Sequence, residues 1–404
     1  MKDLSVLKKL LITCSLLFAS TLYADELSHI LSENKESLFD YDFKSNELNS
    51  DMLSKSWINP VVVRYGKDYN TRFKTGTVDT GTLSVYIDQP IFKSGGIYYA
   101  IKYSDALRNA NRAEIKIQKR KMIGDAVSIL FNLKKNRLEQ KKMRYFVKND
   151  KIDILQKEDS YSVGILDSSF LDQAILKKSQ DEAILLELEL NYLELQQRFS
   201  LLSDKNPNNL RLPKLKMLSK KNYTEGSLEL KKDVLRQEEA SYNAKMTVTK
   251  YLPTVSLQGQ YTNGDLNPLF PNNGMNERYY NYGFSVSMPI DINALTDIEA
   301  SKVANLRAAT QVLDRKDTVE QEYQWIYNSL HILDKRIDLA KKDEKIYASL
   351  LRSTKDLVKA GEKISLDSDI MSNSLHIRKL DQQIYYIDKQ LKLLQLYIRV
   401  ENVF

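Results

Sequence analysis

The feature that most constrains this chain is a strand-to-helix unit that occurs twice, each time with a proline at the end of the strand pattern. Apolar and polar residues alternate from Leu83 to Pro90 and again from Phe284 to Pro289. A long helical pattern follows each proline, and the two prolines lie 199 residues apart (289 − 90). Because proline cannot donate a hydrogen bond to a sheet ladder, we expect both prolines to mark strand ends. The sequence therefore predicts an internal duplication.

Each repeat is predicted to hold a strand hairpin, a long helical hairpin and a connector. Glycine breaks the helical pattern at Gly164 and, 197 residues later (361 − 164), at Gly361. A turn between antiparallel helices needs a residue that tolerates positive φ, which favours glycine. Loops rich in Gly, Thr, Asp, Asn and Pro are predicted at 67–81 and 263–276. In repeat 1 (59–226), the strands are predicted at 59–90 and the helices at 94–203. In repeat 2 (227–404), a connector helix is predicted at 228–249, the strands at 252–289 and the helices at 293–403.

The helical stretches carry apolar residues at alternating spacings of three and four, which is typical of coiled-coil packing. With only 13 Gly and 8 Pro and 28 % charged residues, the composition suits long helices with solvated faces. A helix over 94–162 would be roughly 100 Å long at ~1.5 Å per residue. The clearest apolar runs are Leu185, Leu188, Tyr192, Leu195, Phe199 and Leu202, and Ile377, Leu380, Ile384, Ile387, Leu391, Leu394 and Ile398.

Residues 1–24 have the pattern of a secretory signal peptide. Lysines precede an apolar run at 10–18, which is shorter than the ~20 residues that a membrane-spanning helix needs, and Ala24 ends a cleavage-like site. The only cysteine, Cys14, lies inside the apolar run. Its lipidation is an alternative, although Thr13 is a poor fit for the small residue that such sites favour. We expect an exported protein without disulfides and, at 25–58, an N-terminal periplasmic segment. This segment is polar and weakly periodic, and we expect it to hold short helices or an extended chain.

The sequence argues against catalysis and against nucleic-acid binding. His29, His331 and His376 are far apart, and no metal-ligand spacing, phosphate loop or nucleophile motif accompanies them. We therefore predict no catalytic residue, no metal site and no cofactor. The 60 basic and 53 acidic residues give a net charge of +7, but they are interleaved rather than gathered in a basic stripe.

The four predicted strands are about ten residues long and apolar on one face, which fits a lipid-facing barrel wall. A soluble sandwich with a buried apolar face is the alternative. Four strands cannot close a barrel, since the smallest barrels need about eight, so the open edges must pair with other chains. Three copies would supply twelve strands. Tyrosines near the loop ends suit a membrane-interface belt: Tyr65, Tyr69, Tyr261, Tyr279, Tyr280 and Tyr282.

Beyond these patterns, the chain resembles the TolC-type outer-membrane efflux proteins. The resemblance rests on the signal peptide, the strand opening at 252–257, the run at 89–92 and the paired tips at 161–164 and 358–361. It implies an α+β membrane protein, a homotrimer with a 12-stranded β-barrel (four strands per chain) in the outer membrane, continued by a long α-helical coiled-coil tunnel in the periplasm. Implied partners are outer-membrane lipid, a periplasmic adaptor protein and an inner-membrane pump.

The resemblance also implies a pore entrance at the helix tips. Some family members carry aspartates six and nine residues after the second tip glycine, positions held here by Asp367 and Ile370, so only the first carboxylate is present. A basic residue two after that glycine corresponds to Lys363. Alternatively, Asp367 is a helix N-cap or first-turn carboxylate, and Lys363 is a solvated tip residue.

Two further pairs of positions follow from the resemblance. Gly164 and Gly361 lie where the adaptor would contact the helical hairpins, and Pro90 and Pro289 lie where the barrel would join the tunnel. We expect a passive exit duct of a tripartite efflux pump. A type I protein secretion duct is the alternative within the family. A soluble periplasmic coiled-coil adaptor is a more distant one, and an enzyme is more distant still.

Overall fold

The structure is a computed structural model of the chain, and it describes residues 29–71, 76–265 and 276–401. The predicted signal peptide, Cys14 and the central residues of both predicted polar loops lie outside these residues. The chain divides into two compact units. Unit 1 comprises Met1–Asp40, Lys116–Leu228 and Asp317–Phe404, and unit 2 comprises Tyr41–Ile115 and Glu229–Lys316.

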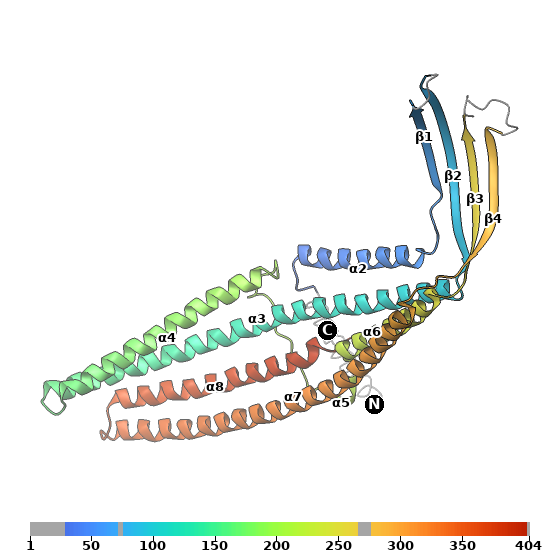
Figure 1. Cartoon of the computed structure of the whole chain (residues 1–404). Coiled ribbons are helices and arrows are strands. Elements are labelled where there is room, and N and C mark those ends of the chain that lie inside the picture. Colours follow the sequence, from blue (N-terminus) through green and yellow to red (C-terminus); the bar gives the residue numbers. More distant parts are fainter. Residues whose placement is uncertain (1–28, 72–75, 266–275, 402–404) are drawn as a thin grey trace, which may run out of the picture. The chain divides into compact units, whose positions relative to one another are not determined.

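The same order of helices and strands occurs twice along the chain (Figure 1). Matching helices are almost equal in length, with 22 and 23 residues before the strands, 67 and 66 after them, and 33 and 34 in the returning helices. The first copy is α2 (Glu33–Ser54), β1 (Val62–Asn70), β2 (Val78–Phe92), α3 (Gly96–Ser162) and α4 (Ser168–Ser200). The second is α6 (Leu228–Lys250), β3 (Thr254–Gly264), β4 (Arg278–Ser287), α7 (Ala294–Lys359) and α8 (Ser365–Ile398), and the short α5 (Lys220–Glu225) precedes it.

Helix α2 is therefore the counterpart of α6, and the duplicated unit begins with a helix before its strands. The polar, weakly periodic sequence at 25–58 gave little sign of a 22-residue helix. One face of α2 in unit 2 is held by α3, because Ser50 Oγ lies 2.9 Å from Ser104 Oγ and Asn46 Nδ2 donates to the Arg108 carbonyl at 2.9 Å. Because these contacts are polar, the residues of α2 that meet α3 do not produce an apolar periodicity in the sequence.

The four strands in unit 2 form one antiparallel sheet in the order β1-β2-β3-β4. Val85 pairs with Val63 on one side and with Tyr261 on the other, and Tyr261 pairs with Tyr280. Directly opposed residues lie on the same face of a sheet. Most apolar residues of the four strands consequently share this face, as their alternation predicts, whereas Val62, Tyr86 and Tyr279 lie on the other face. Within the described residues, no helix is both long enough and apolar enough to cross a membrane.

The strands extend further than predicted, and two expectations about their ends are wrong. The predicted loop at 67–81 is largely strand, because Lys67 pairs with Gly81 and the ladder continues to Asn70. Pro90 does not end its strand, since β2 continues to Phe92 with a register shift after the proline. The last β2 residue paired with β1 is Tyr86, so β1 requires no hydrogen bond from the proline nitrogen. Pro289 lies beyond the end of β4, as expected.

The core of unit 1 follows the coiled-coil spacing. On α8 the residues Ile377, Leu380, Ile384 and Ile387 are all buried, as their three- and four-residue spacing predicts. The predicted run on α4 is less enclosed, and of its members only Phe199 is buried. A fully buried leucine or isoleucine contributes about 1.5–3 kcal/mol, so the α8 face is a major source of stability.

The chain after α8 closes unit 1 through a contact that we call the C-terminal clasp. Residues 399–401 run antiparallel to 226–228, with backbone hydrogen bonds of 2.9 and 3.0 Å around an isolated bridge. The end of α8 lies against α3, where a Cβ on Gly124 would meet Ile398 at 2.3 Å. A Cβ on Gly226 would meet the Val400 side chain at 2.6 Å. Both glycines therefore allow the end of α8 and the residues after it to approach closely, and neither is needed to form a turn.

Candidate functional site

The apolar face of the sheet is exposed in the single chain. Tyr282 is 91 % exposed, and Phe284 and Val63 are also exposed on the same face. Tyr261 and Tyr280 add a pair of rings whose centroids are 5.1 Å apart. β1 and β4 are the edge strands, each with one neighbouring strand among the described residues. A sheet with one bare apolar face and two open edges requires further apolar and backbone partners.

Unit 1 carries two exposed apolar stripes on its helices, one in each repeat. The residues of each stripe recur at coiled-coil spacing, and in both cases the side chains are open to solvent in the single chain. These stripes are distinct from the buried seam of α8. We call them the α4 stripe (Leu176, Leu186, Leu190 and Leu193) and the α7 stripe (Ile332, Leu339 and Ile346).

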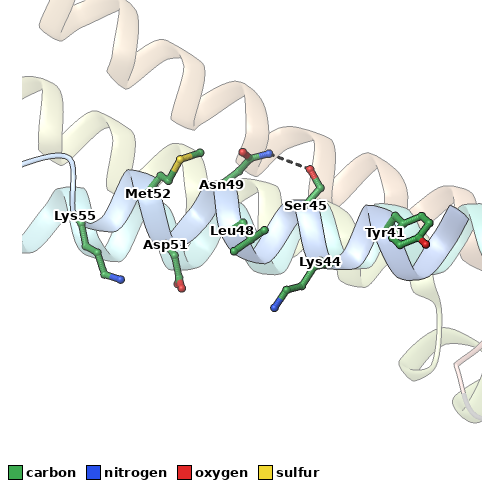
Figure 2. A pocket seen from close by; sticks show the side chains of 8 residues that line it. All are labelled: Tyr41, Lys44, Ser45, Leu48, Asn49, Asp51, Met52 and Lys55. Carbon is green, nitrogen blue, oxygen red and sulfur yellow. Dashed lines mark hydrogen bonds between the residues drawn. The ribbon is translucent and has the colours of Figure 1, made fainter. Parts of the chain in front are cut away.

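Helix α2 presents a similar open face in unit 2. Figure 2 shows the eight side chains that line a hollow there; seven of them belong to α2, and Lys55 follows directly after the end of the helix. Tyr41, Leu48 and Met52 are its exposed apolar members. Since the opposite side of the helix is bound to α3, α2 is packed on one side only.

The tips of the two helical hairpins have nearly the same backbone. Gly164 has φ of +74° and Gly361 has φ of +77°, so the predicted need for glycine in both turns is confirmed. In the first turn the Ile165 N–H donates to the Ser160 carbonyl at 2.9 Å. At the second turn the matching bond runs from the residue after Gly361 and measures 3.0 Å. Both turns are therefore glycine-dependent helix caps of the same type.

Asp367 lies in the first turn of α8 and accepts a hydrogen bond from Gln156 Nε2 at 3.1 Å. The N-cap interpretation of Asp367 is wrong, because the N-cap position belongs to Ile364, whereas the first-turn interpretation is confirmed. Lys363 is exposed. In the first hairpin the N-cap is Asp167, and the backbone hydrogen bond from the amide of Ser169 holds the pKa of that carboxyl below its usual value.

The contact at Asp367 is one of four polar contacts between α3 and α8, which we call the polar ladder. Its members on α3 are seven residues apart, one for each heptad, and periodicity of this kind fixes the register of paired helices. Asp381 is the most buried member and also accepts a hydrogen bond from Arg378 at 3.1 Å. The contacts are Gln156–Asp367 (3.1 Å), Asn149–Asn373 (2.9 Å), Lys142–Asp381 (2.7 Å) and Lys135–Asp388 (2.8 Å).

A second charged cluster joins α3 to α4. Asp150 is 2 % exposed, and one of its oxygens accepts from Lys177 Nζ at 2.8 Å. Its other oxygen is buried and receives no hydrogen bond from the described residues. Burial raises the pKa of Asp181, and the nearby Asp150 carboxylate raises it further. The hydrogen bond with Asp150 likewise raises the pKa of Lys177.

The described residues offer no assembled metal-binding group. No group of three or more His, Cys, Asp or Glu in the described ranges is arranged to hold a metal ion. His376 lies on the surface of α8, where its ring stacks on Tyr145 with centroids 5.0 Å apart and its Nδ1 lies 2.7 Å from the Ser372 carbonyl. The sequence predicted the tip glycines but not the polar ladder. In the sequence its members are ordinary polar residues, and they can be recognised as pairs only when α3 and α8 are seen packed together.

Comparison of the fold with solved structures gives a consistent result. The outer-membrane channel CmeC of Campylobacter jejuni aligns with a TM-score of 0.73, covering 94 % of this chain and 86 % of that one at 14 % identity. The outer-membrane protein VceC of Vibrio cholerae aligns at 0.71, covering 92 % and 94 % at 14 % identity. The MtrE channel of Neisseria gonorrhoeae aligns at 0.68, covering 92 % and 87 % at 11 % identity.

No protein-family model matches the sequence, and neither does any curated protein. The similarity to the channels therefore lies in the three-dimensional structure. It extends over almost the whole of each chain and includes both the sheet and the helical hairpins. The chain has the fold of these solved outer-membrane channels, which confirms the expected combination of a small sheet with long helical hairpins in a TolC-like single chain.

Proposed function

We propose that the chain is an outer-membrane exit duct for small molecules, working in a tripartite efflux pump. The observation that carries this proposal is the sheet, with its bare apolar face and two open edges, joined to two long helical hairpins. The likeness in fold to solved outer-membrane channels supports it. The duct itself is passive, and an inner-membrane pump supplies the energy.

Three copies complete the structure in this proposal. In a ring, one surface of each copy meets a different surface of the next, so each chain needs two unlike open faces. Unit 1 has such a pair in the α4 and α7 stripes, which lie in different repeats. Unit 2 has another pair in the edges of β1 and β4. Joining β1 of one copy to β4 of the next gives a 12-stranded barrel, above the minimum of about eight strands.

The barrel is proposed to lie in the outer membrane, with the helices in the periplasm. The apolar sheet face would meet lipid, and its tyrosines suit the membrane–water interface. Pro90 and Pro289 lie close to where strands give way to helices, so the barrel would join the tunnel there. A soluble periplasmic adaptor would leave this face bare, and the four-stranded sheet thus disfavours that alternative. A type I secretion duct would share the same fold, and the inner-membrane partner would decide between the two.

The gate is proposed at the hairpin tips, where an adaptor would contact Gly164 and Gly361. Three copies of Asp367 would form an anionic ring that favours cations. The hydrogen bond from Gln156 holds this carboxylate near α3, and the exposed Lys363 is available to pair with a neighbouring copy.

Cell fractionation followed by electrophoresis of the detergent-extracted, unheated protein tests the proposal. The chain is expected in the outer-membrane fraction, with the mobility of a trimer that collapses to a monomer on heating. A heated aliquot of the same extract is the control. Recovery as a monomer from the soluble periplasm would contradict the duct.

A further inference from the structure

The two hairpin tips share a backbone but differ in chemistry. Both turns contain a positive-φ glycine and the same pattern of capping hydrogen bonds. Aligned on their glycines, the first tip is apolar where the second is charged. The matched positions are Ile165 and Glu362, Leu166 and Lys363, and Phe170 and Asp367.

The apolar residues of the first tip have no evident use within the chain. Ile165 is 77 % exposed, Val163 is 67 % exposed and Phe170 is 47 % exposed. In this type of cap the residue after glycine often packs on the residues that end the helix, but here those are the polar Ser160 and Asp159. The second tip has glutamate at the position of Ile165, so the turn itself does not require an apolar residue there. Apolar side chains exposed together mark a contact with another molecule.

The charges around the first tip indicate what kind of molecule this is. Residues 158–176 contain four carboxylates and no lysine or arginine. The matched window in the second hairpin, 355–373, contains four carboxylates and three lysines. The first tip therefore presents exposed apolar side chains surrounded by carboxylates. This surface is complementary to an apolar pocket with a basic rim, whereas an anionic lipid surface would repel it. A protein partner is therefore favoured over a membrane.

Both tips face the same end of unit 1. Gln156 lies eight residues before Gly164 (164 − 156), and its partner Asp367 lies six residues after Gly361 (367 − 361). Their 3.1 Å hydrogen bond thus joins the two hairpins within about two helical turns of each tip, and Figure 1 shows both turns at that end of the helices. A partner that reaches one tip also meets the other.

We propose that the two tips divide the docking of the periplasmic adaptor protein, with the first tip inserting Ile165 and its apolar neighbours into a basic-rimmed socket and the second making salt-sensitive contacts. The proposal rests on the proposed function, which supplies the adaptor as partner. In a trimer, three apolar tips alternate with three charged tips. A ring of adaptors would then make apolar contacts at three tips and charged contacts at the other three, although all six turns have a similar backbone.

The test measures binding of the host's purified periplasmic adaptor proteins to the full chain in detergent, at about 50 mM and about 500 mM NaCl. Ile165→Glu gives the first tip the residue that the same turn holds in the second, so the fold is expected to tolerate it. We expect it to weaken binding about tenfold or more at both salt concentrations, as loss of a central apolar anchor does. The matched variant Glu362→Gln is expected to change affinity at low salt and to have little effect at high salt.

Equal binding by wild type and Ile165→Glu would overturn the division between the tips while leaving the proposed duct intact. Absence of binding by the wild-type chain to every adaptor would overturn the proposed function and this inference with it. Two further outcomes would replace the adaptor as occupant. One is Ile165-dependent binding to phosphatidylethanolamine–phosphatidylglycerol vesicles, and the other is Ile165-dependent doubling of mass in analytical ultracentrifugation, which would indicate a second copy.

Discussion

At the scale of single residues, four glycines illustrate two different reasons for a missing side chain. Gly164 and Gly361 adopt positive φ with open space around them, so their role is conformational. Gly124 and Gly226 instead make room for the C-terminal clasp. The first role can be predicted from position in a repeat, because the helical pattern breaks there. The second cannot, because it depends on residues that are far away in the sequence.

Gly124→Ala tests the clasp. The added methyl would meet the Ile398 side chain at 2.3 Å, so that side chain or the end of α8 must shift, and we expect a loss of about 1–3 kcal/mol of stability. Urea denaturation of the detergent-solubilised protein measures the change. The double variant Gly124→Ala/Ile398→Ala should recover part of the loss, because it removes the colliding atoms. Gly164→Ala should have no such dependence on Ile398.

Asp181 predicts a pH dependence. Burial raises its folded-state pKa above the ordinary value of 3.8, so the folded state binds more protons than the unfolded state between those two values. The stability that protonated Asp181 contributes is fully present below the unfolded-state pKa and is lost as the pH rises through the folded-state pKa. Acidification also allows protonated Asp181 to donate to the buried oxygen of Asp150 that lacks a donor.

Asp181→Asn is expected to raise the melting temperature at neutral pH, because the amide donates to Asp150 without carrying charge. It should also flatten the dependence of melting temperature on pH across the acidic range. Melting curves of the purified protein at a series of pH values measure both effects. Asp172→Asn, on the same helix but exposed, is the matched control. An unchanged pH profile in Asp181→Asn would contradict the role given to this cluster.

At the scale of elements, much of the architecture could be predicted from periodicity alone. Alternation located the four strands and their common apolar face, and spacings of three and four located the long helices. Helix α2 was not predicted as one long helix, because polar contacts hold it against α3. The strand ends within 67–81 were not predicted, because the ladder there pairs residues that are typical of loops. Buried and exposed seams obey the same spacing. The sequence therefore could not distinguish the α8 core from the open stripes on α4 and α7.

The polar ladder predicts a specific coupling between α3 and α8. Lys142→Met leaves Asp381 buried with Arg378 as its remaining cationic partner, and we expect a loss of about 1–3 kcal/mol, given that the lysine is partly exposed. The double variant Lys142→Met/Asp381→Leu should recover much of the loss, since no buried carboxylate remains. A double-mutant cycle by urea denaturation measures the coupling. Additive effects of the two changes would show that this contact does not join the helices energetically.

At the scale of the whole molecule, the proposed trimer is expected to depend on the open stripes. Leu190→Glu places a charge in the centre of the α4 stripe, and in the proposed trimer that charge would be buried without a partner. We expect the unheated protein to migrate as a monomer. Asn191→Glu adds the same charge at the next exposed position on α4 and should leave the trimer intact. Trimers in both variants would exclude the α4 stripe from the interface.

Conduction through the assembled duct should depend on Asp367. Neutralising it by Asp367→Asn removes three negative charges from the proposed entrance while leaving an acceptor for Gln156. Block of single-channel current by divalent cations in planar bilayers is then expected to weaken. Asp369→Asn, exposed two residues away, is the matched control. Identical block in wild type and Asp367→Asn would remove this residue from the gate.

The C-terminal clasp also has a consequence for the order in which the chain folds. Arg120 donates to the Val400 carbonyl across 280 residues, and Lys116 pairs with Glu401 across 285. Contacts this distant in sequence form slowly, because a very large loop must close before they contribute. Strands and helical hairpins can form from contacts that are closer in sequence, whereas the clasp cannot close until residues 399–401 meet 226–228. We therefore expect closure of the clasp to be among the last folding steps of a protomer, after both helical hairpins have formed.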